Sequence, residues 1–207
     1  MESVINIPGK CLKELVVQKT KASWSVRNAE ITGKVEVRWS GLVLSICGGA
    51  EVVEGRNTWN EVVEMTRIIA HQGGLVVNGG QDSGVMLASA KNFPENTIGL
   101  VVPQTKTSKL GNYAVVEDYS TRTTIATKHP NVVVFEGGVG TTEEWAMVLR
   151  EIKESLAANV KPPTLYLHEY WKPVFNSLWD IRSMPKRIMD QVKFFSHSKE
   201  VIDLILN

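Results

Sequence analysis

The sequence predicts an α/β fold, in which a doubly wound, Rossmann-like parallel sheet forms a single domain behind an N-terminal extension. From Leu42 onward, short continuous apolar runs alternate with segments whose apolar residues recur at helical spacing. Three of these runs end at paired glycines. The chain has 207 residues, of which 43% are hydrophobic and 22% charged, so it can bury one sizeable core.

The expected strands are apolar runs of four to six residues. They span 42–47, 75–78, 97–102, 113–117, 131–135, 163–168 and 192–196. Because these apolar runs are separated by helical segments, except between 97–102 and 113–117, we expect parallel strands covered on both faces.

The expected helices begin near Thr58 and Ser83 and continue at 120–128, 141–157, 171–181 and 199–206. Thr58 and Glu61 have the spacing of a capping box at the start of the first helix. Paired glycines at 73–74 end that helix.

Residues 1–40 do not join this alternation, so we divide the chain into an extension (1–40) of unassigned role and a domain (41–207). Residues 31–39 alternate apolar and polar side chains, which indicates either a hairpin or an edge strand.

The composition also excludes several classes of function. A formal net charge of +1 gives no reason to expect nucleic acid or an anionic membrane as partner. The sequence shows neither an apolar run of the roughly 20 residues that span a bilayer nor a signal-peptide pattern, which favours the cytoplasm.

The ligand-type side chains do not suggest a metal or a cofactor. Cys11 and Cys47 lack metal-type spacing, and we expect both to be reduced, with Cys47 a small buried residue at a strand end. The four histidines form no pair with ligand spacing. We therefore expect no metal.

Glycine pairs follow three strands, at Gly48-Gly49, Gly79-Gly80 and Gly137-Gly138. In a parallel sheet these loops share one edge and lead into helix N-termini, which bind anions through free N–H groups. A single pair is accounted for by a tight turn, but three pairs on one edge favour a ligand cleft. Neither G-x-G-x-x-G after the first strand nor a P-loop motif is present, so a NAD enzyme and a P-loop NTPase are not expected.

The stretch EGGVGTTEEW (136–145) allows two interpretations of Glu144. Thr141 and Glu144 have capping-box spacing, which would make the glutamate structural. A carboxylate one turn into a helix behind a glycine loop also suits catalysis beside a bound phosphate.

This stretch resembles the P-G-G-x-G-T-x-x-E motif of the Lonely Guy (LOG) family, whose members once carried the name lysine decarboxylase. NGGQDSGVM (78–86) resembles that family's earlier G-G-G-x-x-G-[LV]-M loop, and CGGA (47–50) lies where the family has its first turn. Arg122 falls near the family's essential arginine, in M-x-x-R-K. The resemblance covers roughly residues 41–206.

The resemblance implies a phosphoribohydrolase, which splits a nucleoside 5′-monophosphate such as a cytokinin ribotide or AMP into free base and ribose 5-phosphate. It implies that Glu144 stabilises the developing oxocarbenium charge and that Arg122 assists the substrate or the leaving base. It also implies that the reaction needs neither a metal nor any other cofactor. The implied substrate- and phosphate-binding residues are Gly137, Gly138, Gly140, Thr141, Gly79, Gly80, Gly48, Gly49 and Met86.

Three departures from the family pattern support an alternative. Glu136 replaces the motif's proline, Asn78 replaces a glycine, and Thr123 replaces a lysine. Proteins of this fold also serve as sensors of nucleotide-derived signals or as carriers of the molybdenum cofactor, so a binding protein without hydrolytic activity is the alternative function.

The resemblance also implies a homodimer or a higher homo-oligomer. Trp145 and Met147 are large apolar residues on the long helix after the motif and could face a partner copy. The alternative is that Trp145 packs against the sheet of its own chain.

Overall fold

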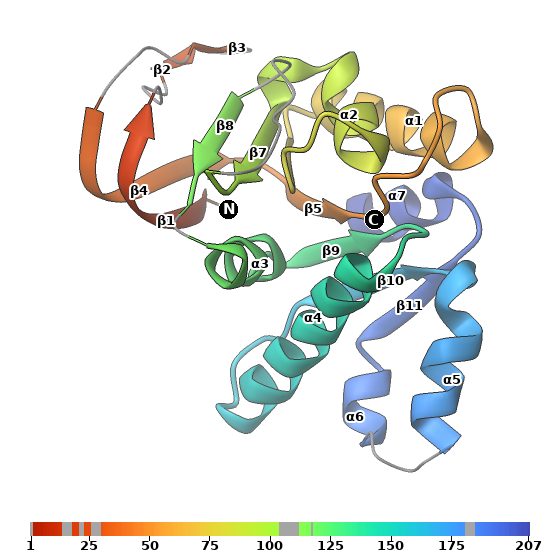
Figure 1. Ribbon diagram of the computed structural model, residues 1–207. Helices are drawn as coiled ribbons and strands as arrows, with labels where there is room; N and C mark the ends of the chain where they lie inside the picture. The colour runs from red at the N-terminus through yellow and green to blue at the C-terminus, as the bar shows by residue number, and fades with distance from the viewer. Residues whose placement is uncertain are drawn as a thin grey trace.

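The computed structural model describes residues 2–13, 18–20, 23–25, 30–103, 112–116, 118–180 and 185–207, with side chains described from residue 41 on, except 178–180. Its centre is a seven-stranded sheet with strand order β11-β10-β9-β5-β6-β7-β8 (Figure 1). Every neighbouring pair of strands is parallel. The strands are β5 (Val43–Cys47), β6 (Leu75–Asn78), β7 (Thr97–Val101), β8 (Asn112–Val115), β9 (Asn131–Val134), β10 (Thr164–His168) and β11 (Val192–Phe195).

The sheet is doubly wound around β5. The chain runs outward through β6, β7 and β8, and then returns to the other side of β5 as β9. The direction of winding therefore reverses between β5 and β9, whose carboxyl ends lie side by side. In folds of this kind ligands bind beyond such a switch point.

Helices cover both faces of the sheet, and each face has its own apolar core (Figure 1). One face packs against α1 (Asn57–His71), α2 (Gly84–Lys91) and α7 (Ser198–Leu206). The other packs against α4 (Val139–Ala157), α5 (Lys172–Asp180) and α6 (Lys186–Met189), with α3 (Tyr119–Thr127) beside α4. Two 3₁₀ turns, η1 (Pro94–Asn96) and η2 (Glu169–Trp171), complete the elements of the domain. This architecture confirms the predicted fold class.

The N-terminal segment forms its own antiparallel ribbon. Strand β1 (Glu2–Lys13) pairs with β4 (Glu30–Ser40), and the short strands β2 (Gln18–Thr20) and β3 (Ser23–Ser25) pair with each other. Of the two alternatives for residues 31–39, the hairpin is therefore found, and β1 lies beside β8 and α3 (Figure 1).

The predicted capping box at Thr58 is wrong. Helix α1 begins at Asn57, so Thr58 is already inside its first turn, and its hydroxyl donates to Glu136 Oε1 at 2.7 Å. The Glu61 carboxylate instead accepts from the Ser198 N–H at 2.6 Å and lies 3.4 Å from His197, which joins α1 to α7. Thr58 and Glu61 therefore bond to residues far away in the sequence and not to each other's backbone.

Two expectations for the core are settled by burial. Trp145 is 1% exposed and packs against Trp171 and Phe175, so it contacts its own chain's core and cannot serve as a partner contact. Cys47 is buried with a free thiol at the end of β5, as expected.

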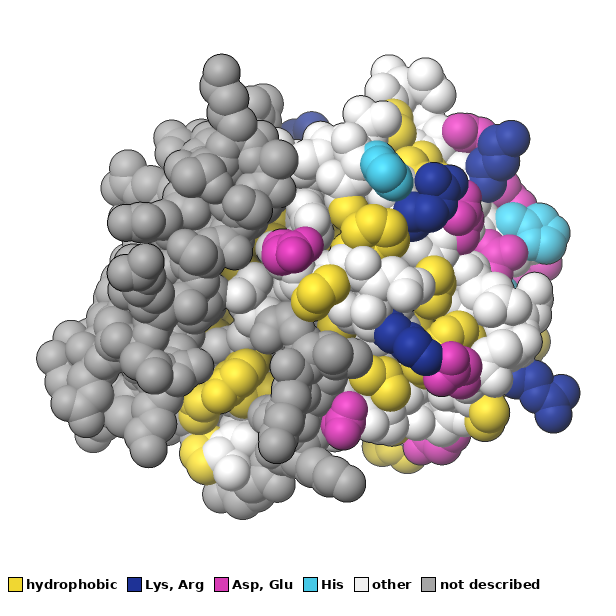
Figure 2. Space-filling model, turned by 90° about the horizontal axis from the view of Figure 1, so that it is seen from above, with side chains coloured by type: hydrophobic (Ala, Val, Ile, Leu, Met, Phe, Trp, Pro, Cys, Tyr) yellow, Lys and Arg dark blue, Asp and Glu magenta, His cyan; other side chains and the backbone are white. Residues whose placement is uncertain are grey.

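The face seen in Figure 2 mixes charges of both signs, and the described helices include none that could span a membrane. In Figure 2, Lys and Arg side chains lie close to Asp and Glu side chains on the visible face. Within the described parts of the chain, no helix is long and apolar enough to cross a bilayer.

Candidate ligand-binding site

A cavity of about 400 Å³ lies beyond the carboxyl ends of β5 and β9, at the switch point. Its volume falls within the roughly 300–1,000 Å³ that ligand pockets usually have. The loops after β5, β6 and β9 and the facing sides of α3 and α4 form its wall. The lining residues are Gly48, Gly49, Ala50, Glu51, Gln81, Met86, Tyr119, Arg122, Thr123, Gly138, Val139, Gly140, Thr141, Glu143 and Glu144.

The loop after β9 presents the N-terminus of α4 to this cavity. Gly138 is the N-cap, and α4 starts at Val139. The N–H groups of the first turn have no acceptor within the helix and carry the positive end of its dipole. A Cβ at Gly138 or Gly140 would have no atom within 4 Å, so the space beside this turn is open.

Other glycines of the site serve loop packing. A Cβ on Gly137 would lie 2.2 Å from Thr141 Oγ1, and the Gly49 N–H donates to the Glu136 carbonyl at 2.8 Å. Gly84 has φ +56°, and a Cβ there would lie 2.1 Å from the Gly49 carbonyl. Only glycine allows these loops to approach so closely.

The loop after β6 contributes Gln81 to the main wall, while its two glycines lie outside that wall. A Cβ on Gly79 would lie 3.4 Å from Arg122 Nη1, and Gly80 lines a small neighbouring cavity. Met86 is buried, as expected of a core residue, and it also lines both the main cavity and the small neighbouring one.

Asn78, a departure from the family pattern, holds this loop in shape. Its Oδ1 accepts from the Gly80 N–H at 2.7 Å, and its Nδ2 donates to Ser89 Oγ at 2.6 Å. The Asn78 side chain is buried, and both its oxygen and its nitrogen are hydrogen-bonded. The asparagine that replaces the family's glycine therefore stabilises the loop and does not line the main cavity.

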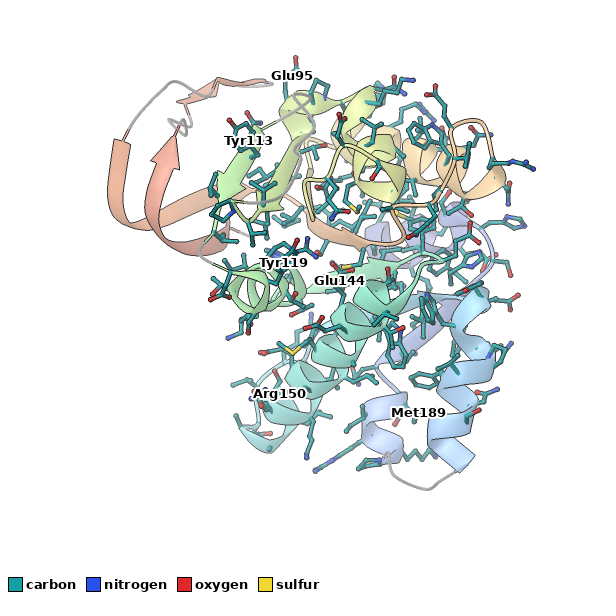
Figure 3. All side chains as sticks on the ribbon, viewed as in Figure 1. Glu95, Tyr113, Tyr119, Glu144, Arg150 and Met189 are labelled. Carbon is teal, nitrogen blue, oxygen red and sulfur yellow. The ribbon has the colours of Figure 1, made fainter. Side chains whose placement is uncertain are left out.

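Arg122 and Glu144 meet at the cavity. Arg122 Nη2 lies 3.3 Å from Glu144 Oε1, and the two side chains are only 11% and 10% exposed. The guanidinium also lies over the Tyr119 ring, 5.1 Å from its centroid, while Arg122 Nε has no hydrogen-bond partner among the described residues. In Figure 3, Tyr119 lies on α3 and Glu144 on α4, whereas Arg150 lies further along α4.

Burial raises the pKa of Glu144 from 4.5 to about 7, and the nearby Glu143 contributes in the same direction. The Arg122 guanidinium and a hydrogen bond with the Cys47 side chain oppose this rise. Burial, aided by Glu144, raises the pKa of the Cys47 thiol well above its usual range, so the thiol stays protonated. Glu144 therefore exists as a mixture of acid and carboxylate near neutral pH.

The structural alternative for Glu144 is not found. Helix α4 has no side-chain hydrogen bond at its cap, and the Glu144 carboxyl group interacts with Arg122 instead. The capping-box spacing of Thr141 and Glu144 is thus unused, because the cap position lies three residues earlier, at Gly138.

The carboxylate of Glu136 is turned toward another helix. It accepts from Thr58 in the first turn of α1, where the helix dipole favours a negative charge. Glu136 lines a second cavity and is absent from the wall of the main one. The carboxylate that replaces the family's proline is therefore bonded to α1 and does not line the main cavity.

Thr123, the third departure, bonds within its own helix. It is buried, and its hydroxyl donates to the Tyr119 carbonyl at 2.9 Å.

Sequence reasoning missed several wall residues: Glu51, Gln81, Tyr119, Val139 and Glu143. Tyr119 precedes Arg122 by three positions, which places both side chains on one face of a helix. The expected helix began at residue 120, one position too late to include Tyr119. Glu51 and Gln81 lie in loops, where the sequence has no periodicity that predicts direction.

The described residues contain no group of three His, Cys, Asp or Glu side chains that could hold a metal ion. The polar groups in the wall of the main cavity are the α4 amides, the Arg122 guanidinium, the Gln81 carboxamide, and carboxyl and hydroxyl groups.

The fold and the site define a doubly wound α/β protein with a cavity at its switch point. A family model described as the SLOG cluster4 family matches residues 42–170, well over half of the 207 residues. The protein belongs to this family, within the LOG-like superfamily, and the predicted resemblance is confirmed at that level. No curated protein matches the sequence.

Solved structures with the same fold include molybdenum cofactor proteins. The molybdenum cofactor binding protein from the phototrophic bacterium Rippkaea orientalis is 20% identical, with a TM-score of 0.60, over 80% of this chain and 95% of that chain. The molybdenum cofactor carrier protein MCP from Chlamydomonas reinhardtii is 20% identical, with a TM-score of 0.59, over 80% and 96% of the two chains. At this identity the similarity concerns the fold.

Proposed function

We propose that this protein binds a phosphate-bearing, nucleotide-like small molecule in the cleft at the switch point, and that binding is its function. One observation carries the proposal: the first turn of α4 opens into the cavity at Gly138 and Gly140, where a Cβ would meet nothing, with Arg122 in the same wall. Free amides, a helix dipole and a guanidinium together suit a phosphate.

An exposed aromatic ring in the wall can bind the rest of the ligand. The ring of Tyr119 is 52% exposed and rests on the Arg122 guanidinium. A planar heterocycle can stack on such a ring while its phosphate lies on α4. The proposed residues for phosphate are Gly138, Gly140 and Thr141, with Gly137 packing the loop against Thr141 and with Gly48 and Gly49 shaping the opposite wall. Gly79 and Met86 lie next to each other beside Arg122, and Gly80 lines the small neighbouring cavity.

Two of the solved structures with this fold are named as a molybdenum cofactor binding protein and a molybdenum cofactor carrier protein, and that cofactor is one member of the proposed class of ligand. Its organic part joins a phosphate to a fused heterocycle, which suits the α4 turn and Tyr119. The Cys47 thiol is buried and its pKa is raised, so it does not suit a metal-binding thiolate. The residues present thus fit the organic phosphate portion.

Hydrolysis of a nucleoside 5′-monophosphate is the second candidate, and the Arg122–Glu144 pair favours it. A carboxyl group with a pKa of about 7 in a cavity wall is suited to proton transfer at neutral pH. Its ionised form would stabilise positive charge on a ribose while Arg122 assists the leaving base.

Calorimetric titration of the purified protein with AMP, adenosine and inorganic phosphate tests the proposal. We expect AMP to bind and adenosine to bind at least tenfold more weakly, because the phosphate is held by α4. Chromatography of the same mixtures for free adenine distinguishes binding from hydrolysis: intact AMP supports the binding function, and released adenine supports the second candidate.

The matched variants are Gly140→Asp and Ala146→Asp. The first adds a negative charge in the open first turn of α4, where it favours the helix but repels phosphate. The second adds the same charge on the exposed side of the same helix. Loss of AMP binding in Gly140→Asp alone supports the site, and equal affinities in both variants would contradict it.

A further inference from the structure

A second cavity, of about 320 Å³, lies across the loop after β9 from the main one. Three residues, Gly49, Glu51 and Gly138, line both cavities. Only the second cavity also includes Val52, Glu136, Gly137 and Tyr170. The α4 turn proposed for phosphate therefore borders two cavities.

The ridge between the two cavities consists of glycine backbone. Gly49 donates to the Glu136 carbonyl at 2.8 Å, and a Cβ on Gly49 would lie 3.0 Å from the Gly137 Cα, so the two loops touch there. Gly138 continues this ridge, and a Cβ at Gly138 would meet nothing within 4 Å. No side chain rises from these glycines, but the Glu51 carboxylate lies beside Gly49, with its Oε2 2.8 Å from where a Cβ on Gly49 would be. A ligand that extends from one cavity into the other therefore crosses at Gly138, next to the Glu51 carboxylate that lines both cavities.

The charges of the main cavity limit the kind of phosphate that it accepts. Its wall carries one guanidinium, of Arg122, against the carboxyl groups of Glu51, Glu143 and Glu144. At pH 7 a phosphate monoester carries a charge between −1.5 and −2, because its second pKa is about 6. A phosphodiester carries a single negative charge, so the carboxylates repel it less.

The second cavity offers acceptors and an aromatic ring. Glu51 and Glu136 supply carboxylate oxygens, which accept hydrogen bonds from hydroxyl or amino groups. The Tyr170 ring is 53% exposed and is held edge-to-face by Trp171 at 5.0 Å, while the Tyr170 N–H donates to His168 Nδ1 at 3.2 Å. A fixed, exposed ring beside acceptors suits a nucleoside, whose sugar donates and whose base stacks.

We propose that the ligand of this site is a phosphodiester with two organic arms. Its singly charged phosphate group lies on the first turn of α4, one arm lies against Tyr119, and the second arm crosses the glycine ridge to Tyr170. This inference rests on the proposed phosphate binding and specifies the class of ligand.

Three probes separate the effect of charge from that of the second arm. AMP has two negative charges and one arm, AMP monomethyl ester has one charge and one arm, and the dinucleotide adenylyl-adenosine has one charge and two arms. By calorimetry we expect the methyl ester to bind about tenfold tighter than AMP, because one repelling charge is removed. The dinucleotide should gain at least a further tenfold.

Tyr170→Ala and Tyr119→Ala locate the arms, since both side chains are half exposed and their loss leaves the core intact. Tyr170→Ala should return the dinucleotide to the affinity of the methyl ester and leave AMP unchanged, whereas Tyr119→Ala should weaken all three probes. Diesters that bind no tighter than AMP, or a dinucleotide gain that survives Tyr170→Ala, would overturn the inference while leaving phosphate binding intact. If none of the probes binds, the proposed function fails together with it.

Discussion

Arg122 Nη2 lies 3.3 Å from Glu144 Oε1, and both side chains are about nine-tenths buried in the wall of the cleft. Helix α3 supplies the cation and α4 the carboxyl group, so the pair joins the two helices that face each other across the site. A buried pair of this kind adds little net stability, because desolvation offsets most of the Coulomb attraction, but losing one partner is costly. The predictions below use this asymmetry.

The pH dependence of stability should reveal the buried carboxyl group of Glu144. Its pKa is raised from 4.5 to about 7, so its contribution to stability is full below pH 4.5 and is lost as pH rises through 7. Relative to Glu144→Gln, the wild type should lose about 3 kcal/mol of unfolding free energy between pH 4.5 and 8, at about 1.4 kcal/mol per pKa unit. Urea denaturation of both proteins across this range measures the difference.

His129 acts in the opposite direction and cancels in this comparison. Burial lowers its pKa from 6.5 to about 4, so stability is lost as pH falls through that window in both proteins. A wild-type and Glu144→Gln difference that does not change with pH would show that Glu144 is not desolvated.

Removing the cation should be costly only when Glu144 is ionised. Arg122→Met leaves the carboxyl group buried without its partner, and we expect a loss of roughly 3–5 kcal/mol at pH 8. At pH 5 Glu144 is mostly protonated and leaves no buried charge without a partner, so the loss of unfolding free energy should be much smaller. Denaturant titrations at the two pH values test this; equal losses at both would contradict an electrostatic role for the pair.

Gly140→Ala should separate stability from binding. The added methyl group meets nothing in the protein and replaces a helical glycine, so unfolding free energy should rise by about 0.5–1 kcal/mol. The same methyl group occupies the space proposed for phosphate, so AMP affinity should fall. Thermal unfolding and calorimetry on one preparation give both values, and unchanged affinity would place the ligand elsewhere.

Asn78→Ala tests the architecture of the loop after β6. The change removes the bonds to Gly80 and Ser89 from a buried position, and we expect a cost of about 1–3 kcal/mol. Glu143→Gln, on an exposed side chain, is the control for stability and should stay within about 0.5 kcal/mol. A neutral Asn78→Ala would mean that the loop does not depend on these bonds.

The fold was predictable because its signals are local and redundant. The strands from β5 to β11 are mostly apolar, with exceptions such as Lys193 within β11, and the expected ends lie within two residues of those observed wherever the chain is described. The end of the strand expected at 113–117 and the last residue of the helix expected at 171–181 lie outside the described residues. The four-residue helix α6 was missed, because so short a segment shows no helical period.

The site was only partly predictable, because its geometry depends on partners far apart in the sequence. The spacing of Thr141 and Glu144 was equally compatible with a helix cap and with a functional carboxyl group. The contact between Glu144 and Arg122 on α3, which the sequence did not reveal, distinguishes these two interpretations. The direction of Glu136 depends on Thr58, 78 positions earlier. Contacts between residues so far apart produce no periodic pattern in the sequence from which they could be predicted.

Backbone amide NMR shifts during titration with AMP test the central claim most directly. If phosphate binds at the first turn of α4, the amides of Val139, Gly140 and Thr141 should show the largest changes, together with the side-chain Nε–H of Arg122. Adenosine at the same concentration should leave these amides nearly unmoved. Shifts that are absent from this turn, or that adenosine reproduces in full, would contradict the assignment of the cleft as a phosphate-binding site.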